Sequence, residues 1–331
     1  MTMTNGLARG VLALGLLSLA SAACAAQDAA EQDPSSGSDW RLVWSDEFDG
    51  DAIDPARWTL EQDCWGGGNA ERQCYTAFEE NARIEDGHLV IEARLGEAQG
   101  PALPAHMRAN ATEEERRATT TQPFTSARLN TREKGDWTYG RIEVRARLPE
   151  GQGTWPAIWM LPTDEYYGGW AASGEIDILE AVNLGEPCRE CRGDVENRIF
   201  GTLHYGGEWP ENTYQNRETT LPVSADGEQD FHVFAVEWTQ GRIEWFLDGE
   251  SYGYLTQRRW RSASEAARGR PYAPFDQRFH LILNLAVGGH LAEGRNVGGV
   301  RVEAFPQQFL IDWVRVYDCP QDLETAQACA N

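Results

Sequence analysis

An alternating segment, Gly140-Arg141-Ile142-Glu143-Val144-Arg145-Ala146-Arg147-Leu148, has aliphatic side chains on one face of a strand and charged ones on the other. A period of two is typical of a strand in a sheet with one buried face. Helical periodicity is limited to a turn or two at 111–118 and 262–268. Many short strands and Gly-rich turns therefore predict an all-β sandwich of two sheets. Further strands, with an Asp-Gly hairpin turn at 248–249, are predicted at 88–93, 231–238, 243–247, 280–287 and 309–317.

Three carboxylates lie within six residues of the run Ser173-Gly174-Glu175-Ile176-Asp177-Ile178-Leu179-Glu180. In a regular strand Glu175 and Asp177 face the same way and Glu180 faces the opposite way. One extra residue, a β-bulge around Ile178 and Leu179, would return Glu180 to their face. The two Glu carboxyls could then approach the ~5–5.5 Å separation of a retaining glycosidase. The alternative is a solvated acidic face, since the chain has 52 Asp and Glu against 29 Lys and Arg.

Aromatic segments flank this acidic run, at residues 155–160 and 204–210. The chain has 13 Trp among 331 residues, more than core packing alone usually requires. Indole rings stack on the C–H faces of pyranose sugars. Acids beside indoles therefore favour a sugar site, although each Trp could instead be a core residue.

The N-terminus reads as an export signal, with Arg9 before an apolar segment at 11–20 that is too short to span a membrane comfortably. Cleavage after Ala25 would release a soluble protein, either secreted or periplasmic. Cleavage before Cys24 would leave a lipid-anchored lipoprotein, for example in an outer membrane. Residues 26–39 are expected to form a polar tether. A single domain at 40–319 and a C-terminal tail at 320–331 would follow.

Six cysteines remain after this segment is removed. An even number in an exported chain predicts three disulfides. The simplest of 15 connectivities pairs neighbours. A zinc site is the alternative for Cys188 and Cys191, but no second ligand pair lies at suitable spacing. The neighbour pairs are Cys64 with Cys74, Cys188 with Cys191, and Cys319 with Cys329.

The net charge of −23 disfavours nucleic acids, anionic membrane surfaces and strongly anionic polysaccharides as partners. We expect a monomer that acts on a neutral polysaccharide.

Ordered motifs between about Trp44 and Tyr317 resemble glycoside hydrolase family 16, and within it the laminarinase-like branch. This resemblance implies a β-jelly-roll of two antiparallel sheets with a concave cleft, and retaining hydrolysis of β-glucan. The Glu-x-Asp-x-x-Glu pattern of the acidic run is the bulged form of that branch. The other motifs are 44–48 (Trp-Ser-Asp-Glu-Phe), 69–76, 125–129, 153–162, 204–207 (His-Tyr-Gly-Gly), 284–289 and 312–317.

The resemblance assigns roles to the three acids. It implies that Glu175 is the nucleophile, that Glu180 is the acid/base, and that Asp177 helps to hold the protonation pattern. No cofactor is needed for this chemistry. The family often has a structural Ca²⁺, whose matching ligands here are the carbonyls of Glu47 and Gly87 and the carboxylate of Asp312. Expected substrate-binding residues are Asn69, Arg128, Trp155, Trp159, Trp170 and His204.

The expected activity is endo-β-1,3-glucan hydrolysis by double displacement. Mixed-linkage β-1,3-1,4-glucan and galactans such as agar or carrageenan are alternative substrates for the same mechanism. A non-catalytic glucan-binding protein is the alternative from another class. Two segments depart from the family pattern. Residues 290–292 read His-Leu-Ala where relatives commonly have Asn-Trp-Pro, and 97–122 form a long surface insertion that could border the cleft or lie away from it.

Overall fold

The computed structural model describes residues 39–222 and 230–330. The predicted signal segment at 1–25, the lipid attachment site at Cys24 and all but the end of the 26–39 tether lie outside this part. No helix among the described residues is both long and apolar enough to cross a membrane.

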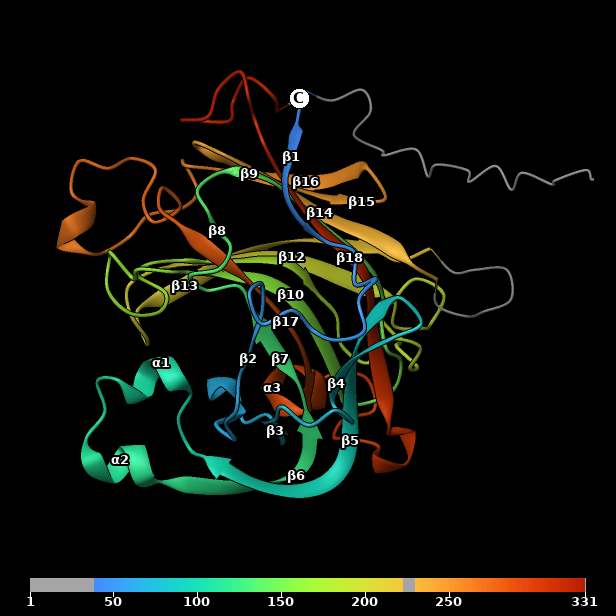
Figure 1. Cartoon of the computed structure of the whole chain (residues 1–331). Coiled ribbons are helices and arrows are strands. Elements are labelled where there is room, and N and C mark those ends of the chain that lie inside the picture. The colour runs from blue at the N-terminus through green and yellow to red at the C-terminus, as the bar shows by residue number, and fades with distance from the viewer. Residues whose placement is uncertain (1–38, 223–229, 331) are drawn as a thin grey trace, which may run out of the picture. The chain divides into compact units, whose positions relative to one another are not determined.

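Two sheets lie one above the other, with β9, β14, β15 and β16 above β10, β12 and β17 in Figure 1. The first sheet has ten strands, antiparallel except where β3 runs parallel to β6. Its order is β16 (Glu250–Thr256), β15 (Arg242–Leu247), β14 (His232–Thr239), β9 (Gly140–Arg147), β18 (Gln307–Asp318), β5 (His88–Pro101), β6 (Thr119–Ser126) and β3 (Gln73–Tyr75), with β1 (Arg41–Asp46) on β18 and β4 (Ala82–Glu85) on β5.

The second sheet has eight strands, all antiparallel, and carries the acidic run on β11. Its order is β13 (Asn212–Thr220), β12 (Arg198–Gly206), β11 (Glu175–Glu180), β10 (Thr154–Pro162), β17 (Phe279–Val287), β7 (Arg128–Asn130) and β2 (Thr59–Leu60), with β8 (Asp136–Trp137) on β17. Helices are short: α1 (Ala105–Arg108), α2 (Glu113–Arg117), α3 (Gly289–Glu293) and 3₁₀ turns at Gly66–Gly68, Glu265–Ala267 and Val302–Ala304.

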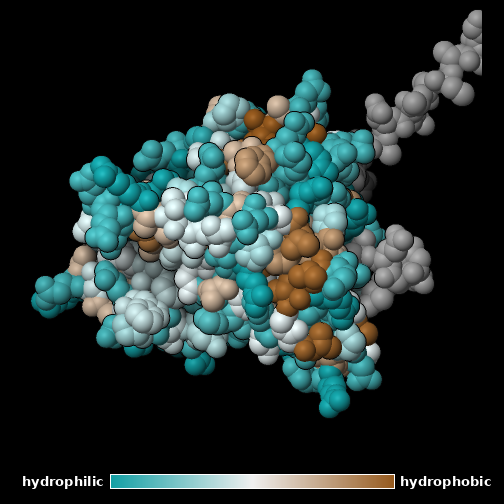
Figure 2. Space-filling view, turned by 90° about the horizontal axis from the view of Figure 1, so that it is seen from below, coloured by the Kyte–Doolittle hydropathy of each residue, from teal (hydrophilic) through white to brown (hydrophobic). Residues whose placement is uncertain are grey.

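The core lies between the two sheets and is built from their alternating apolar side chains. Val144 and Ile311 from the first sheet and Ile178 and Leu283 from the second are each no more than 1% exposed. Seen from below in Figure 2, the surface is mostly hydrophilic and its hydrophobic side chains gather in a few places. The all-β sandwich expected from the alternating segments is confirmed.

The predicted strands correspond to β5, β9, β14, β15, β17 and β18; their ends agree closely, except that β5 continues to Pro101 instead of ending at residue 93. Asp248 and Gly249 have φ of 51° and 81°, as the predicted two-residue hairpin turn requires. The two predicted helical turns are the turn at Glu265–Ala267 and α2. The predicted surface insertion at 97–122 contains strand as well as helix. Its two ends extend β5 and β6, which stay paired as far as Pro101 and Thr119.

The disulfides join sequence neighbours, as predicted: Cys64 with Cys74, Cys188 with Cys191, and Cys319 with Cys329. Zinc binding by Cys188 and Cys191 is thereby contradicted, because thiolates joined to each other are not free to bind metal.

Candidate active site

The strand that carries the three acids, β11, contains the predicted bulge. Between Asp177 and Glu180 it advances three residues while the paired strand β12 advances two. The extra residue turns Glu180 to the face of Glu175. The two residues between, Ile178 and Leu179, are both buried in the core.

Trp245 of β15 holds this bulge from the opposite sheet. Its indole Nε1 donates a 2.8 Å hydrogen bond to the backbone carbonyl of Asp177. Gly201 lies opposite the bulge on β12, and a Cβ there would come within 2.2 Å of the Trp245 indole. The missing side chain at Gly201 therefore makes room for the indole that anchors β11.

Three predicted binding residues contact the acids directly. His204 on β12 has its Nε2 3.5 Å from Oε1 of Glu175 and 3.3 Å from Oδ2 of Asp177. Trp170 donates from Nε1 to Oε2 of Glu175 at 2.7 Å. In the same way, Nε1 of Trp155 donates to Oε1 of Glu180 at 3.1 Å.

Burial and mutual repulsion disfavour ionisation of all three acids. Burial, with a smaller contribution from the charge of Asp177, raises the pKa of Glu175 to about 8. Burial followed by the charge of Glu180 holds the pKa of Asp177 well above its usual range. Burial also raises the pKa of Glu180, while His204 and the Trp155 hydrogen bond act in the opposite direction. The cluster therefore retains protons at a pH where exposed carboxyls have lost them.

This cluster makes stability depend on pH. Because the folded pKa of Glu175 lies above its ordinary value of 4.5, the folded state binds more protons between pH 4.5 and 8 and loses stability as pH rises. The full shift corresponds to at most about 5 kcal/mol. We expect Glu175→Gln to raise Tm over wild type by several degrees at pH 8 and by little at pH 4. Scanning calorimetry at both pH values measures this. A Tm difference that does not change with pH would contradict it, and Glu250→Gln, at an exposed position of β16, is the control.

Of the remaining predicted substrate-binding residues, Trp159 and Arg128 lie on strands of the same sheet as the acids, and Asn69 lies in a loop. Trp159 of β10 donates from Nε1 to Oδ1 of Asn284 on β17 at 2.7 Å. The Arg128 guanidinium on β7 lies 4.6 Å from the centroid of the Trp159 ring. Asn69, in the loop before β3, donates to Oε1 of Glu71 at 3.3 Å. The candidate cleft therefore runs from β11 across β10 and β17 towards β7.

Exposure separates the three indoles. Trp170 is 38% exposed and Trp159 is partly buried, so both have surface left for a sugar. Trp155 is only 9% exposed and packs against Val182, Ala286 and Ala292. Most of the Trp155 side chain is therefore packed in the core, as the alternative interpretation expected, although its indole N–H still donates to Glu180.

Some residues beside the cleft were not predicted. Asn284 receives the Trp159 hydrogen bond and donates from Nδ2 to the Tyr75 hydroxyl at 3.0 Å. Asn284 is the first residue of the family motif at 284–289, and that motif was the sequence signal that could have identified it. The ring of Tyr214, 62% exposed on β13, lies 5.7 Å from that of His204, and nothing in the sequence pointed to it.

The predicted calcium ligands lie on or beside three neighbouring strands, since β1 and β5 both pair with β18. Glu47 follows β1, Gly87 precedes β5 and Asp312 lies on β18. Oδ2 of Asp312 pairs with Arg145, and its Oδ1 is 3.7 Å from Nε2 of His88. A carboxylate and two carbonyls are oxygen ligands of the kind that Ca²⁺ prefers, but the Asp312 carboxylate is already paired with Arg145, which would compete with the ion.

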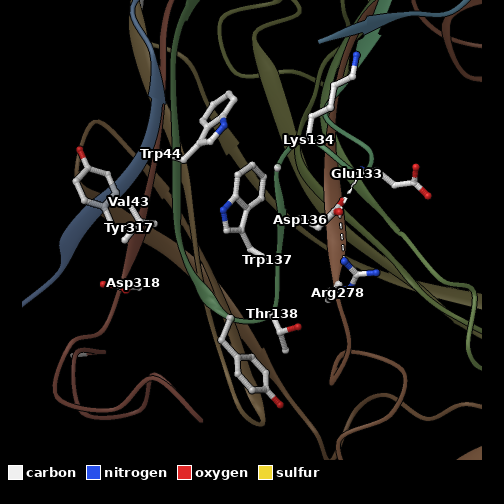
Figure 3. Close-up of a pocket in the computed structure, with 12 residues that line it drawn as sticks. Val43, Trp44, Glu133, Lys134, Asp136, Trp137, Thr138, Arg278, Tyr317 and Asp318 are labelled. Carbon is white, nitrogen blue, oxygen red and sulfur yellow. Dashed lines mark hydrogen bonds and ion pairs between the residues drawn. The ribbon is translucent and has the colours of Figure 1, made fainter. Parts of the chain in front are cut away.

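A hollow with a volume of about 510 Å³ lies away from the acids. Figure 3 shows that Trp44 and Trp137 line it, together with Arg278 and Asp318. The two indoles meet edge to face with centroids 5.5 Å apart. None of the predicted site residues lines this hollow, so it is separate from the candidate cleft.

Comparison with known proteins agrees with this geometry. The model of the family described as "Glycosyl hydrolases family 16" matches residues 104–314. Glucan endo-1,3-beta-glucosidase A1 of Niallia circulans is 38% identical over 284 residues, which make up 83% of this chain but only 37% of that protein. A beta-glucanase of Rhodothermus marinus is 41% identical over 282 residues, 84% of this chain and 85% of that protein. The X-ray structure of the laminarinase from Rhodothermus marinus aligns with a TM-score of 0.64 at 41% identity, covering 84% of this chain and 97% of that one.

Proposed function

The chain belongs to glycosyl hydrolases family 16, and we propose that it is a retaining endo-β-1,3-glucanase acting on laminarin-like glucan. The acid cluster carries this proposal. The bulge of β11 turns Glu175 and Glu180 to one face, where Trp170 and Trp155 each donate an indole N–H to one of them. Paired carboxyls with raised pKa values, next to aromatic side chains, are the groups that glycosidic bond cleavage uses.

We assign the two chemical steps to two acids. The Glu175 carboxylate attacks the anomeric carbon, while Glu180 donates its proton to the leaving glycosidic oxygen. This forms a covalent glucosyl ester and releases the first product. Glu180, now ionised, removes a proton from water, which attacks the anomeric carbon and frees Glu175. Two inversions give net retention of the β configuration.

Asp177 is assigned the role of holding the proton that keeps Glu175 ionised. The negative charge of Asp177 is the second contribution, after burial, to the raised pKa of Glu175. That contribution disappears once Asp177 carries a proton, which the raised pKa of its buried carboxyl favours. Hydrogen bonding from Trp170 then supports the carboxylate form needed for attack.

The proposal predicts the products of wild type on four polysaccharides. Laminarin is expected to yield oligosaccharides of mixed length, because an endo-acting enzyme cleaves within the chain. Barley mixed-linkage glucan, agarose and carrageenan represent the alternative substrates, and chromatography of products distinguishes them. Products from agarose or carrageenan alone would move the proposal to a galactanase. Binding of laminarin with no cleavage of any of the four would indicate a glucan-binding protein.

Retention predicts the anomer that is released first. Early ¹H NMR spectra of laminarin digests are expected to show the β-anomeric signal before mutarotation produces the α form. An α signal appearing first would exclude double displacement.

We further propose that the protein is exported as a monomer with one catalytic domain at 40–319. Three disulfides among the described residues support an oxidising compartment. The described part of the tail, residues 320–330, is held to the domain by the Cys319–Cys329 bond and by a hydrogen bond from Gln240 N to Thr325 O. Mass spectrometry of the mature N-terminus distinguishes cleavage after Ala25 from lipid attachment at Cys24.

A structural Ca²⁺ at Glu47, Gly87 and Asp312 is also proposed. It would join β1, β5 and β18 on the sheet opposite the acids and would take no part in the chemistry. EDTA is expected to lower the Tm of wild type by several degrees and to leave the Tm of Asp312→Asn unchanged, because that variant has lost its charged ligand. Equal Tm values with and without EDTA in wild type would contradict the site.

A further inference from the structure

The strand β12 places every second residue opposite one of the three acids of β11. The residues paired with Glu175, Asp177 and Glu180 are His204, Thr202 and Phe200, in that order. Residues opposite each other in an antiparallel pair direct their side chains to the same face of the sheet. The Phe200 ring, only 5% exposed, therefore lies beside Glu180 on the face that carries the acids.

The guanidinium of Arg295 lies over the Phe200 ring. Its central carbon is 4.7 Å from the ring centroid, a distance at which the ring attracts a cation. Arg295 belongs to the loop after α3, close to residues 290–292, where this chain departs from the family pattern. Phe200 therefore holds the positive charge of Arg295 on the side of the sheet where Glu180 lies.

Two buried amide side chains fix the loop that carries Arg295. Gln152, just before β10, donates from Nε2 to the backbone carbonyls of Ala292 and Arg295 at 3.3 and 3.4 Å. Asn183, which follows β11, donates from Nδ2 to the carbonyl of Ala292 at 2.8 Å and to Oδ1 of Asn296 at 2.9 Å. The backbone on both sides of Arg295 is therefore tied to the strand that carries the acids and to its neighbour.

Arg295 has no carboxylate partner of its own in residues 39–222 and 230–330. Its guanidinium forms no ion pair there, and its buried Nη1 has no hydrogen-bond partner. Two other arginines near this loop are paired, Arg72 with Glu293 and Arg301 with Glu186. The charge of Arg295 is not neutralised in this way, so its field extends to the acid cluster.

Charged and titratable groups act on Glu180 from its own strand, from β12 and from this loop, and they are Glu175, Asp177, His204 and Arg295. The neighbouring strand β10 contributes the uncharged indole of Trp155. Burial raises the pKa of Glu180, while His204, the Trp155 hydrogen bond and Arg295 lower it, in decreasing order. His204 is positive only when its ring is protonated, whereas a guanidinium keeps its charge at any working pH. Arg295 is therefore the permanent positive charge in this set.

We propose that Arg295 is a positioning residue for the acid/base, and that its fixed positive charge stabilises the ionised Glu180 that the second step requires. This role rests on the proposed function, because double displacement needs Glu180 protonated in one step and ionised in the next. Burial keeps the proton on Glu180 until the leaving oxygen takes it. Arg295 then favours the resulting carboxylate, which removes a proton from the attacking water.

The test follows the second step with dinitrophenyl β-laminaribioside. Dinitrophenolate leaves without a proton, so hydrolysis of the glycosyl-enzyme limits kcat, and kcat rises with pH as Glu180 ionises. Removing a positive charge raises the pKa of a neighbouring carboxyl. In Arg295→Met the rise of kcat is therefore expected to move to higher pH by roughly one unit, which lowers kcat about tenfold on the acid side. Azide, which needs no base, should restore the turnover of this variant.

Charge and shape are separated by further variants. Arg295→Lys keeps the charge and should retain the pH profile of wild type. Arg295→Gln is neutral and polar, should shift as Arg295→Met does, and decides the question if Arg295→Met does not fold by circular dichroism. Arg147→Met is the matched control, because Arg147 also lies over a ring, that of Phe231 at 5.6 Å, but on the other sheet. Its pH profile should equal that of wild type.

The pH profiles of the neutral variants decide the role of Arg295. Unshifted profiles in Arg295→Met and Arg295→Gln would overturn the proposal. An equal shift in Arg295→Lys would also overturn it, because the effect would then follow the shape of the side chain and not its charge. Wild type that hydrolyses neither this substrate nor laminarin would instead refute the glucanase itself.

Discussion

Glu175→Gln is expected to lower turnover on laminarin by about 10⁴-fold or more, because an amide cannot form the glycosyl ester. Glutamine keeps the shape of the side chain and can still contact the indole of Trp170. Laminarin affinity, measured by calorimetry, should therefore change little. Loss of kcat with an almost unchanged Kd is the signature of a group that acts in the transition state.

The same substitution at another glutamate tests whether this loss of turnover is specific to position 175. Glu250→Gln removes one charge from an exposed position on the other sheet and should retain full activity. Substantial activity in Glu175→Gln, with the sequence of the variant verified by mass spectrometry, would contradict the assignment of Glu175 as the nucleophile.

Glu180→Ala is expected to lower laminarin hydrolysis by about 10²–10⁴-fold, because the leaving sugar then departs without a proton. An aryl β-glucoside whose phenolate leaves without protonation should still glycosylate the variant and give a burst of phenol. The second step lacks its base, so the glucosyl-enzyme should accumulate. Azide, a nucleophile that needs no base, is expected to restore turnover and yield a β-glycosyl azide.

The anomer of the azide product separates the two roles. In a variant lacking the nucleophile, azide attacks the substrate directly and gives the α-glycosyl azide. An α product from Glu180→Ala, or a β product from Glu175→Ala, would reverse the assignments of Glu175 and Glu180.

Local pattern predicted the strands well, because alternation reports which face of a strand is buried. It also predicted the bulge on β11, since the parity of Glu180 required an extra residue. The same pattern could not predict that β5 continues to Pro101. Residues 94–101 form a strand because they pair with 119–125. Such pairing depends on the fold, and a polar segment that contains glycine has no local pattern that predicts it.

The candidate site was predicted where motifs name residues and missed where only the fold brings them together. The clustering of His204 with Glu175 and Asp177 follows from the pairing of β11 with β12, which the motifs imply. Tyr214 reaches His204 from a strand with no motif. Nothing in the sequence distinguishes Asp63 from the many other acids of this chain, because only the fold buries it near Arg128.

The indole of Trp245 can donate to the carbonyl of Asp177 because residue 201 is a glycine, whose missing side chain leaves space for the ring. The residues at positions 201 and 245, which belong to different sheets, therefore depend on each other. A side chain at position 201 would collide with the indole, and a smaller residue at position 245 would leave both a cavity and an unpaired carbonyl beneath the acids. A substitution at either position alone is therefore expected to disturb the bulge that places Glu180, unless the other position changes with it.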